Sequence, residues 1–327
     1  MSANRWTDFP LRANRFLEQA FPLLISAGVI LGFALPWVFI GLRPLVPWLF
    51  GTVTLVGALK LRVRELGRTI SSPIPILFFF FFARIVIPLV VFLLSSLVFR
   101  NDPDIVSGYV LLYSVPAAVT SFIWVSIFKG DPALALTLIM LDTMLAPIVV
   151  PGTVQFFLGT AITLNITGMA LSLIFMVVIP TIAGVALNES SRGKIPALVT
   201  PYLAPLSKLF MVLVIAANAS VVAPQIRLDN PQMWIILAAC IGFIVLIFTC
   251  TRLATLAGKF NREKQISLLF TSSLRNTIAA MTLAIRYFPE SAALPALLGI
   301  LVQQNTAAIM GRIFFGKIGS NETKNSQ

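Results

Sequence analysis

The chain is a succession of long apolar segments separated by short polar connections. Ten such segments occur, and all but one contain about 18 to 27 residues, the length that a helix needs to cross a hydrocarbon core of roughly 30 Å. None alternates in the way of a barrel strand, so each segment is expected to be a helix. The segments lie at Phe21–Ile40, Val46–Leu59, Ile74–Val98, Ile105–Phe128, Ala133–Gly159, Gly168–Leu187, Leu203–Val222, Trp234–Leu256, Gln265–Ile285 and Ala292–Phe315.

This pattern predicts an integral membrane protein. Hydrophobic residues make up 58% of the chain and charged residues only 11%, whereas about a quarter of the residues of a soluble protein are charged. The net charge of +12 does not indicate a nucleic-acid partner, because the basic residues lie in short connections between apolar segments. The lipid bilayer is the expected surrounding.

The placement of Lys and Arg predicts the topology. One side of the expected bundle collects 18 of them, whereas the other side has four, Arg43, Arg100, Arg227 and Arg286. Basic residues favour the cytoplasmic side, so we expect a multi-pass protein of the cell membrane with both termini in the cytoplasm. Residues 1–20 are expected to form a cytoplasmic amphipathic segment at the lipid surface, and residues 317–327 a cytoplasmic tail.

The two halves of the chain, residues 21–160 and 168–316, resemble each other. The start of the first span, Phe21-Pro22-Leu-Leu-Ile, is echoed by Val178-Ile179-Pro180-Thr-Ile in the sixth. Two consecutive copies of five spans must insert with opposite orientations. Inverted repeats of this kind are typical of secondary transporters, whose substrate site lies between the repeats near the bilayer midplane.

Two spans contain polar interruptions at corresponding positions. In the fourth span, Pro116 lies between Ser114 and the pair Thr120-Ser121, and a proline there frees backbone carbonyls. In the ninth span, residues 271–277 form a polar island. Freed backbone groups are tolerated in a bilayer only against protein or a water-filled cavity, so discontinuous fourth and ninth helices are expected to cross near the midplane. A simple kink at Pro116 is the alternative.

Three ionisable residues lie deep within the predicted spans: Arg84, Asp142 and Arg275. Each would cost about 3 kcal/mol at the centre of a membrane helix, so pairing is expected. One interpretation is a structural Arg–Asp bridge. The other places Arg275, partly neutralised by Asp142, in a cavity that keeps one net positive charge and suits a carboxylate or sulfonate. If Asp142 titrates instead, transport would be coupled to protons.

Several motifs resemble the bile acid:sodium symporter family. They are the run from Tyr113 through Pro116 and Lys129-Gly130-Asp131-Pro132 to Thr137, then Ala146-Pro147, Arg275-Asn276 and Leu298-Gly-Ile-Leu-Val-Gln303-Gln304. The resemblance implies a ten-helix transporter with a panel region and a core region, the core holding two crossed discontinuous helices. The Lys129-Gly130-Asp131-Pro132 turn is also similar to that of the related arsenite permeases. Those proteins are expected to carry a cysteine in the fourth helix, which this chain lacks, so arsenite is disfavoured as a substrate.

The chain departs from the family at the positions that the resemblance implies for sodium. Ser121-Phe122 stands where the family has Ser-Asn, and Thr271 and Arg275 stand where it has Glu and Gln. Ala83, ahead of Pro88, replaces a third-helix Gln. A guanidinium has donors only and repels a cation, so sodium coupling is left open and Arg275 is expected to stand in the place of the ion.

These observations predict an all-α membrane protein with ten transmembrane helices in two inverted five-helix repeats. The predicted function is secondary active transport of a small organic anion by alternating access, with sodium or proton coupling open. A proton-coupled or uniport carrier and a non-transporting sensor or scaffold of the same fold are the alternatives. An enzyme, a metal site and a cofactor are not expected, because the chain has no histidine, no Cys–His pair and no paired aspartates. The candidate substrate or ion-binding residues are Arg275, Asn276, Thr271, Ser272, Thr120, Ser121, Asp142, Thr143, Arg84 and Gln303, with the helix break at Pro116.

Overall fold

The protein is helical wherever its structure is described. The computed structural model describes residues 14, 17, 20–59, 61, 73–159, 165–227 and 229–316, and within them the only β pairing is one isolated bridge. The expected tail at 317–327 lies outside the described residues, as does the amphipathic segment at 1–20 apart from residues 14, 17 and 20.

The helices of the two halves follow one another with short connections. The first half contains α2 (Phe21–Ala34), α3 (Pro36–Phe39), the 3-10 turn η1 (Ile40–Leu45), α4 (Val46–Ala58), α6 (Pro73–Phe81), the π-helical turn η2 (Phe82–Val86), α7 (Ile87–Val98), α8 (Pro103–Ser114), α9 (Ser121–Ile127) and α10 (Pro132–Leu158). The second half contains α11 (Ile166–Leu173), the π-helical turn η3 (Ile174–Val178), α12 (Ile179–Ser190), α13 (Lys194–Val222), η4 (Ala223–Gln225), α14 (Pro231–Ala257), α15 (Arg262–Ser273), α16 (Thr277–Tyr287), η5 (Glu290–Ala293) and α17 (Leu294–Phe315).

Seven helical stretches of the described chain are long and apolar enough to cross a membrane, rather than the ten that the sequence predicts. The other three predicted spans are the 14-residue α2, which ends at Ala34 ahead of Pro36, and the interrupted pairs α8–α9 and α15–α16. Large apolar side chains face outward, and Phe156 is 81% exposed. Long apolar helices with an apolar surface make this a multi-pass membrane protein, whereas the ten-span inverted repeat stays a prediction.

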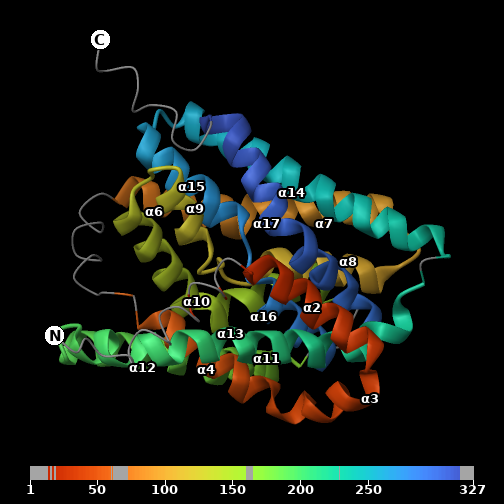
Figure 1. The fold of residues 1–327 in the computed structure, drawn as a ribbon. Coiled ribbons are helices and arrows are strands. Elements are labelled where there is room, and N and C mark those ends of the chain that lie inside the picture. Colours follow the sequence, from red (N-terminus) through yellow and green to blue (C-terminus); the bar gives the residue numbers. More distant parts are fainter. Residues whose placement is uncertain are drawn as a thin grey trace.

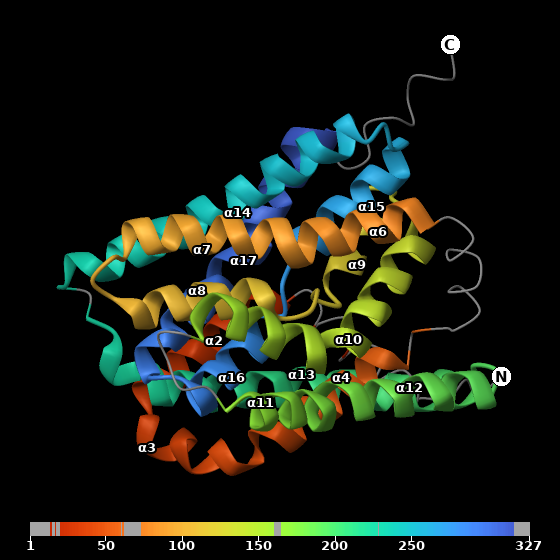
Figure 2. The ribbon, with the colours of Figure 1, turned by 180° about the vertical axis from the view of Figure 1, so that it is seen from behind.

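The helices form two groups, which we call the panel and the core. The panel consists of α2, α4, α11–α12 and α13, in which α13 packs along α2 and α4, and α4 along α12. The core consists of α6–α10 and α14–α17, in which α14 packs on α15 and α17, and α7 on α8. In Figure 1 most of the panel lies below the core, and Figure 2 shows α6 and α7 running as one long rod across the core.

Polar caps and prolines start the helices of the core. Asp102 accepts a hydrogen bond from the Ile105 amide at the start of α8, and Asp131 accepts one from Leu134 at the start of α10. A proline follows each of these caps, where its missing N–H would have no helical partner anyway. These local signals set the start of α8, the first half of the broken helix, and the start of α10, the helix that follows its second half.

Close contact between helices depends on glycine at a few points. A Cβ atom added at Gly108 of α8 would lie 2.2 Å from the carbonyl oxygen of Ala292 in η5. Small residues allow backbones to approach closely where membrane helices pack, and here they bring the start of α8 against the connection between α16 and α17.

Candidate functional site

The fourth and ninth predicted spans are both broken, as the sequence predicts. The backbone leaves the helical conformation after Ser114 at the end of α8 and resumes it at Ser121, the first residue of α9. Val115 is extended because the ring of Pro116 excludes the helical conformation from the residue before it. The second break is shorter and runs from Leu274 to Asn276, between α15 and α16.

The two breaks pair with each other. The Ala118 amide donates to the Leu274 carbonyl at 3.0 Å, and the Asn276 amide donates to the Pro116 carbonyl at 3.0 Å. These bonds make an antiparallel bridge centred on Ala117 and Arg275. The two predicted breaks therefore meet and exchange two backbone hydrogen bonds, whereas their crossing near the membrane midplane stays a prediction.

The side chain of Gln303 on α17 holds the backbone of Arg275. Its Oε1 accepts from the Arg275 amide, and its Nε2 donates to the Arg275 carbonyl, both at 3.0 Å. Gln303 is buried, so both bonds lie away from water. This places Gln303, a candidate from the sequence, directly against the second break.

The Arg275 side chain is completely buried. Its Nη2 donates to the carbonyl oxygen of Ala83 at 2.8 Å, whereas Nε and Nη1 have no hydrogen-bond partner among the described residues. Leaving buried donors unsatisfied costs about 1–3 kcal/mol each, and more when the group is charged. The guanidinium thus keeps two donor nitrogens, Nε and Nη1, for which the described residues provide no acceptor.

The Ala83 carbonyl is available because of Pro88. In the π-helical turn η2 the Ile87 amide bonds to the Phe82 carbonyl, five residues back. The next bond of that kind would run from residue 88 to Ala83, but proline has no N–H to donate. The Arg275 guanidinium donates to the Ala83 carbonyl, which Pro88 leaves without a backbone donor. The sequence analysis did not predict this contact, and Pro88 is the one sequence feature that points to it.

Arg84 and Asp142 form the buried ion pair. Arg84 Nε donates to Asp142 Oδ1 at 2.6 Å, and a second guanidinium nitrogen contacts the same oxygen. Asp142 Oδ2 accepts from the Ala117 amide at 2.7 Å, and Arg84 also donates to the Ser114 carbonyl at the end of α8. The Arg–Asp bridge that the sequence analysis offered as one interpretation is therefore present, with Arg84 on η2 as the partner of Asp142.

The three buried charged residues of the described chain are Arg84, Asp142 and Arg275, and they sum to one positive charge. Both arginines are close enough to influence each other electrostatically, since Arg275 bonds to the residue that precedes Arg84. The residual charge that the sequence predicts is thus present, with Arg84–Asp142 as the neutral pair and Arg275 as the charge without a carboxylate partner.

The hydroxyl candidates divide into satisfied and unsatisfied groups. Thr271 donates to the Ser267 carbonyl one turn back, and Ser121 donates to Ala118 at the first break. The hydroxyls of Ser272 and Ser273 are buried without a partner among the described residues. Thr143 is buried beside Asp142 on α10. Only Ser272 among the predicted hydroxyls of the ninth span therefore has free hydrogen-bonding capacity.

Two further candidates have structural contacts. Asn276 caps α16, since its Oδ1 accepts from the Ala279 amide at 3.2 Å. The Thr120 hydroxyl accepts from Gln304 Nε2 at 3.1 Å, and Trp124 Nε1 donates to Gln304 Oε1 at 2.8 Å. Gln304 and Trp124 were not predicted as site residues, because nothing in the sequence brings α9 and α17 together.

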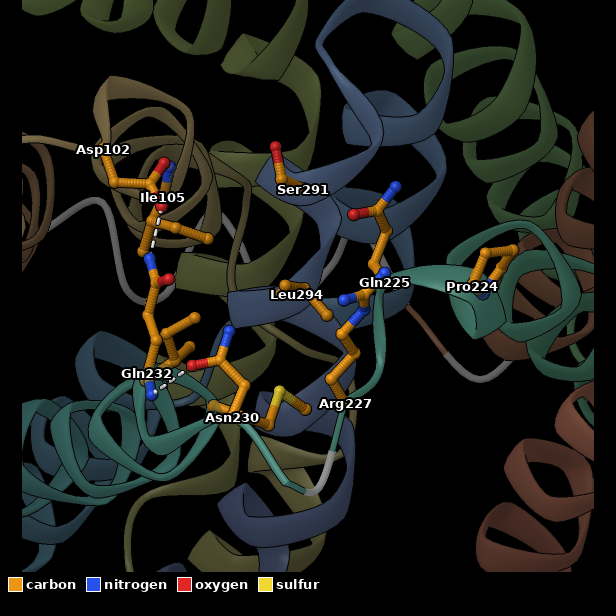
Figure 3. A pocket seen from close by; sticks show the side chains of 11 residues that line it. Asp102, Ile105, Pro224, Gln225, Arg227, Asn230, Gln232, Ser291 and Leu294 are labelled. Atoms are coloured by element: carbon orange, nitrogen blue, oxygen red, sulfur yellow. Dashed lines mark hydrogen bonds between the residues drawn. The ribbon is translucent and has the colours of Figure 1, made fainter.

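Two cavities lie away from the crossing. The smaller, of about 370 Å³, is polar, and Figure 3 shows Asp102, Gln225, Arg227, Gln232 and Ser291 around it. The larger, of about 570 Å³, lies between α4, α11–η3 and the last turn of α16, and is named here the α11–α16 cavity. Arg275 lines neither of them and is completely buried, so the cavity that the sequence analysis expected around this guanidinium is neither of these two.

Comparison with known proteins identifies the family. A profile of the sodium bile acid symporter family matches residues 47–227, more than half of the chain. The uncharacterized protein YbaS of Bacillus subtilis (strain 168) is 35% identical over 293 residues, which cover 89% of this chain and 95% of that protein. The chain belongs to the sodium bile acid symporter family.

Other members of the sodium bile acid symporter family are more distant. The probable sodium/metabolite cotransporter BASS1, chloroplastic, of Arabidopsis thaliana is 25% identical, over 73% of this chain and 58% of that protein. The uncharacterized sodium-dependent transporter YocS of Bacillus subtilis (strain 168) is 22% identical, over 88% of both chains. The family that the motifs around Pro116 and Arg275 indicated is therefore confirmed.

Proposed function

We propose that this protein is a secondary active transporter that carries a small organic anion across the cell membrane by alternating access. Family membership supports a transporter, and relatives bear the names of sodium/metabolite cotransporters and a sodium-dependent transporter. The observation that carries the anion is Arg275, which is completely buried and has two donor nitrogens without a partner among the described residues. We assign it as the group that binds the substrate anion.

The free donors of Arg275 favour an oxyanion. Nε and Nη1 lie on different edges of the planar guanidinium, and each offers a charge-assisted hydrogen bond to an oxygen of a carboxylate or sulfonate. The crossing supports this assignment, because two helix breaks that bond to each other hold the Arg275 backbone and Gln303 fixes it further. Ser272, with its free hydroxyl two residues before the break, is assigned as a second contact.

We propose further that the fixed guanidinium takes the role of a coupling cation. By resemblance, Ala83 and Arg275 hold positions of sodium ligands, and here Arg275 itself donates to the Ala83 carbonyl. A cation at this oxygen excludes a second one by repulsion and by occupying the acceptor. Uptake of the anion is therefore expected to be independent of sodium. The relatives, in contrast, bear names that describe sodium-coupled or sodium-dependent transport.

Reconstituted protein in sealed vesicles tests the proposal. A panel of radiolabelled carboxylates would be offered with an inward sodium gradient, an inward proton gradient or neither. At least one carboxylate should accumulate, and Arg275→Gln should reduce its uptake at least tenfold, because a charge-assisted pair is lost. Arg275→Lys keeps the charge but not the planar edge, and should recover only part of the activity.

The gradients separate the alternatives. Uptake driven by the proton gradient and not by the sodium gradient would make the protein a proton-coupled carrier. Equal equilibration with no gradient would make it a uniporter. No uptake of any carboxylate, or uptake unchanged in Arg275→Gln, would overturn the proposal in favour of a non-transporting membrane protein of this fold. Both termini are assigned to the cytoplasm, which accessibility of tags at either end would check.

A further inference from the structure

Two arginines share one aromatic ring at the end of the core where α14 ends, α15 begins and α17 ends. The guanidinium carbon of Arg252 lies 4.8 Å from the centre of the Phe315 ring, and that of Arg262 lies 5.8 Å from it. Both are distances of cation–π contacts. Figures 1 and 2 show these three helix ends close together. We call Arg252, Arg262 and Phe315 the Phe315 cluster.

Hydrogen bonds hold both guanidinium groups in place. Arg252 of α14 donates to the side-chain oxygen of Gln265 on α15, and Gln265 Nε2 donates to the Phe260 carbonyl at 2.6 Å. Arg262 Nη2 donates to the carbonyl oxygen of Phe315 at 2.9 Å. Each arginine is thus bonded to a helix other than its own, and the cluster joins the ends of three core helices.

The two positive charges of the cluster are not neutralised by the protein. Neither Arg252 nor Arg262 forms an ion pair within the described part of the chain. Glu263 follows Arg262 in the sequence, but its carboxylate pairs with neither arginine. The arginines are close enough for the charge of Arg262 to act on Arg252. Like charges that are held together repel, so an anion bound between them would stabilise the cluster.

The cluster lies at the depth of lipid head groups. α14 contains 27 residues and is about 40 Å long, whereas the hydrocarbon core of a bilayer is about 30 Å thick. Its ends therefore extend into the head-group region. Arg252 is about 8 Å from the last residue of the helix, Ala257, and its long side chain can carry the charge to the polar interface. Arg262, in the first turn of α15, is exposed.

An apolar surface runs from the cluster toward the middle of the bilayer. Ile241 and Val245 lie about three turns and two turns before Arg252, on the same face of α14. Their side chains are 40% and 38% exposed, so this face is open to lipid. Cations at head-group depth above an exposed apolar face match a ligand with an anionic head and a long hydrocarbon chain.

The phosphate of a phospholipid has the chemistry that the cluster requires. Its oxygens accept charge-assisted hydrogen bonds from guanidinium groups, which can be bidentate. By the charge distribution, the connection between α14 and α15 lies on the cytoplasmic side, where the membrane surface carries anionic lipids. Basic pockets between membrane helices on this side bind such head groups in other proteins.

We propose that the Phe315 cluster binds the head group of an anionic phospholipid of the cytoplasmic leaflet. Arg252 and Arg262 bind its phosphate, and the face of α14 that carries Ile241 and Val245 contacts an acyl chain. The site is separate from the proposed transport of an anion, because its residues belong to neither helix break. Phosphatidylglycerol is a suitable probe, and phosphatidylcholine with the same acyl chains is its match without net charge.

Native mass spectrometry of the delipidated full chain, released from detergent micelles, measures the binding of each lipid. The wild-type protein should bind its first phosphatidylglycerol at least about tenfold more tightly than phosphatidylcholine, because a charge-assisted interaction is added. Arg252→Gln with Arg262→Gln should abolish this preference. Arg252→Lys with Arg262→Lys keeps both charges but not the planar donors, and should retain only part of it.

Matched variants separate a built site from general surface charge. Phe315→Leu keeps every charge but removes the ring that holds both guanidinium groups, and should weaken phosphatidylglycerol binding about tenfold. Arg192→Gln with Lys194→Gln removes two exposed cations from another connection on the same expected side, and should leave the preference within about twofold. Monodisperse elution in size-exclusion chromatography shows that each variant is folded.

Three outcomes would overturn the lipid site. They are equal binding of the two lipids by the wild-type protein, an unchanged preference in Arg252→Gln with Arg262→Gln, and an equal loss in the Arg192 and Lys194 control. Displacement of phosphatidylglycerol by excess inorganic phosphate would show a site for free phosphate instead, and would also overturn it. Arg275→Gln should keep the preference, so a protein that binds the lipid but moves no carboxylate would sustain this site and overturn only the transport proposal.

Discussion

Replacing Asp142 by Asn tests whether the buried charges form one network. The substitution keeps the size of the side chain but removes the charge that accepts from Arg84 Nε at 2.6 Å and from the Ala117 amide at 2.7 Å. The interior then holds two arginines and no carboxylate among its described residues. Breaking a buried ion pair by removing one partner costs about 3–5 kcal/mol, so the equilibrium constant for folding should fall by a factor of more than about 100.

Equilibrium unfolding in mixed micelles of dodecyl maltoside and sodium dodecyl sulfate measures this loss. The double variant Asp142→Asn with Arg84→Gln removes both members of the pair, and should regain about 2 kcal/mol relative to Asp142→Asn alone because no unpaired charge remains. A loss below 1 kcal/mol for Asp142→Asn, or additive effects in the double variant, would refute the network. The charge of Arg84 would then be solvated by some other route.

Two further substitutions probe the crossing and its surroundings. Gln303→Leu leaves the buried amide and carbonyl of Arg275 without partners. It should lower the free energy of unfolding in the same micelle assay by about 2–5 kcal/mol. A change below 1 kcal/mol would show that other groups bond to the Arg275 backbone. Gly108→Ala places a Cβ atom 2.2 Å from a backbone oxygen and should cost about 1–3 kcal/mol, whereas Gly152→Ala, with nothing within 4 Å, should cost nothing. Equal stability of the two alanine variants would contradict the close packing of α8.

The sequence predicts the interrupted helices well because their causes are local. Pro116 excludes the helix at the residue before it, and the polar residues 271–277 cannot stay unpaired in lipid. The prediction for the first span rested on hydropathy and made the helix too long. The apolar run continues to Ile40, but α2 ends at Ala34, two residues before Pro36. Hydropathy does not take account of a proline that ends a helix.

The contacts of the candidate site depend on tertiary structure, and here the sequence is less informative. Arg84 and Asp142 are 58 residues apart, and nothing in their spacing shows that Asp142 pairs with Arg84 rather than with Arg275. A polar side chain that bonds to its own helix is not free to bind a ligand, and the sequence does not show which side chains do so. Asn276 caps a helix and Thr271 bonds to its own preceding turn, while Ser272 beside it stays free.

The single unbalanced charge of Arg84, Asp142 and Arg275 has an electrical consequence. Moving one elementary charge through the whole membrane potential changes the energy by about 2.3 kcal/mol per 100 mV. In the proposed transport cycle, a core that carries this charge while empty, and is neutralised by a monovalent anion, responds to voltage on its unloaded return and not on its loaded stroke. We therefore expect the polarity of the membrane to set which way the empty protein faces.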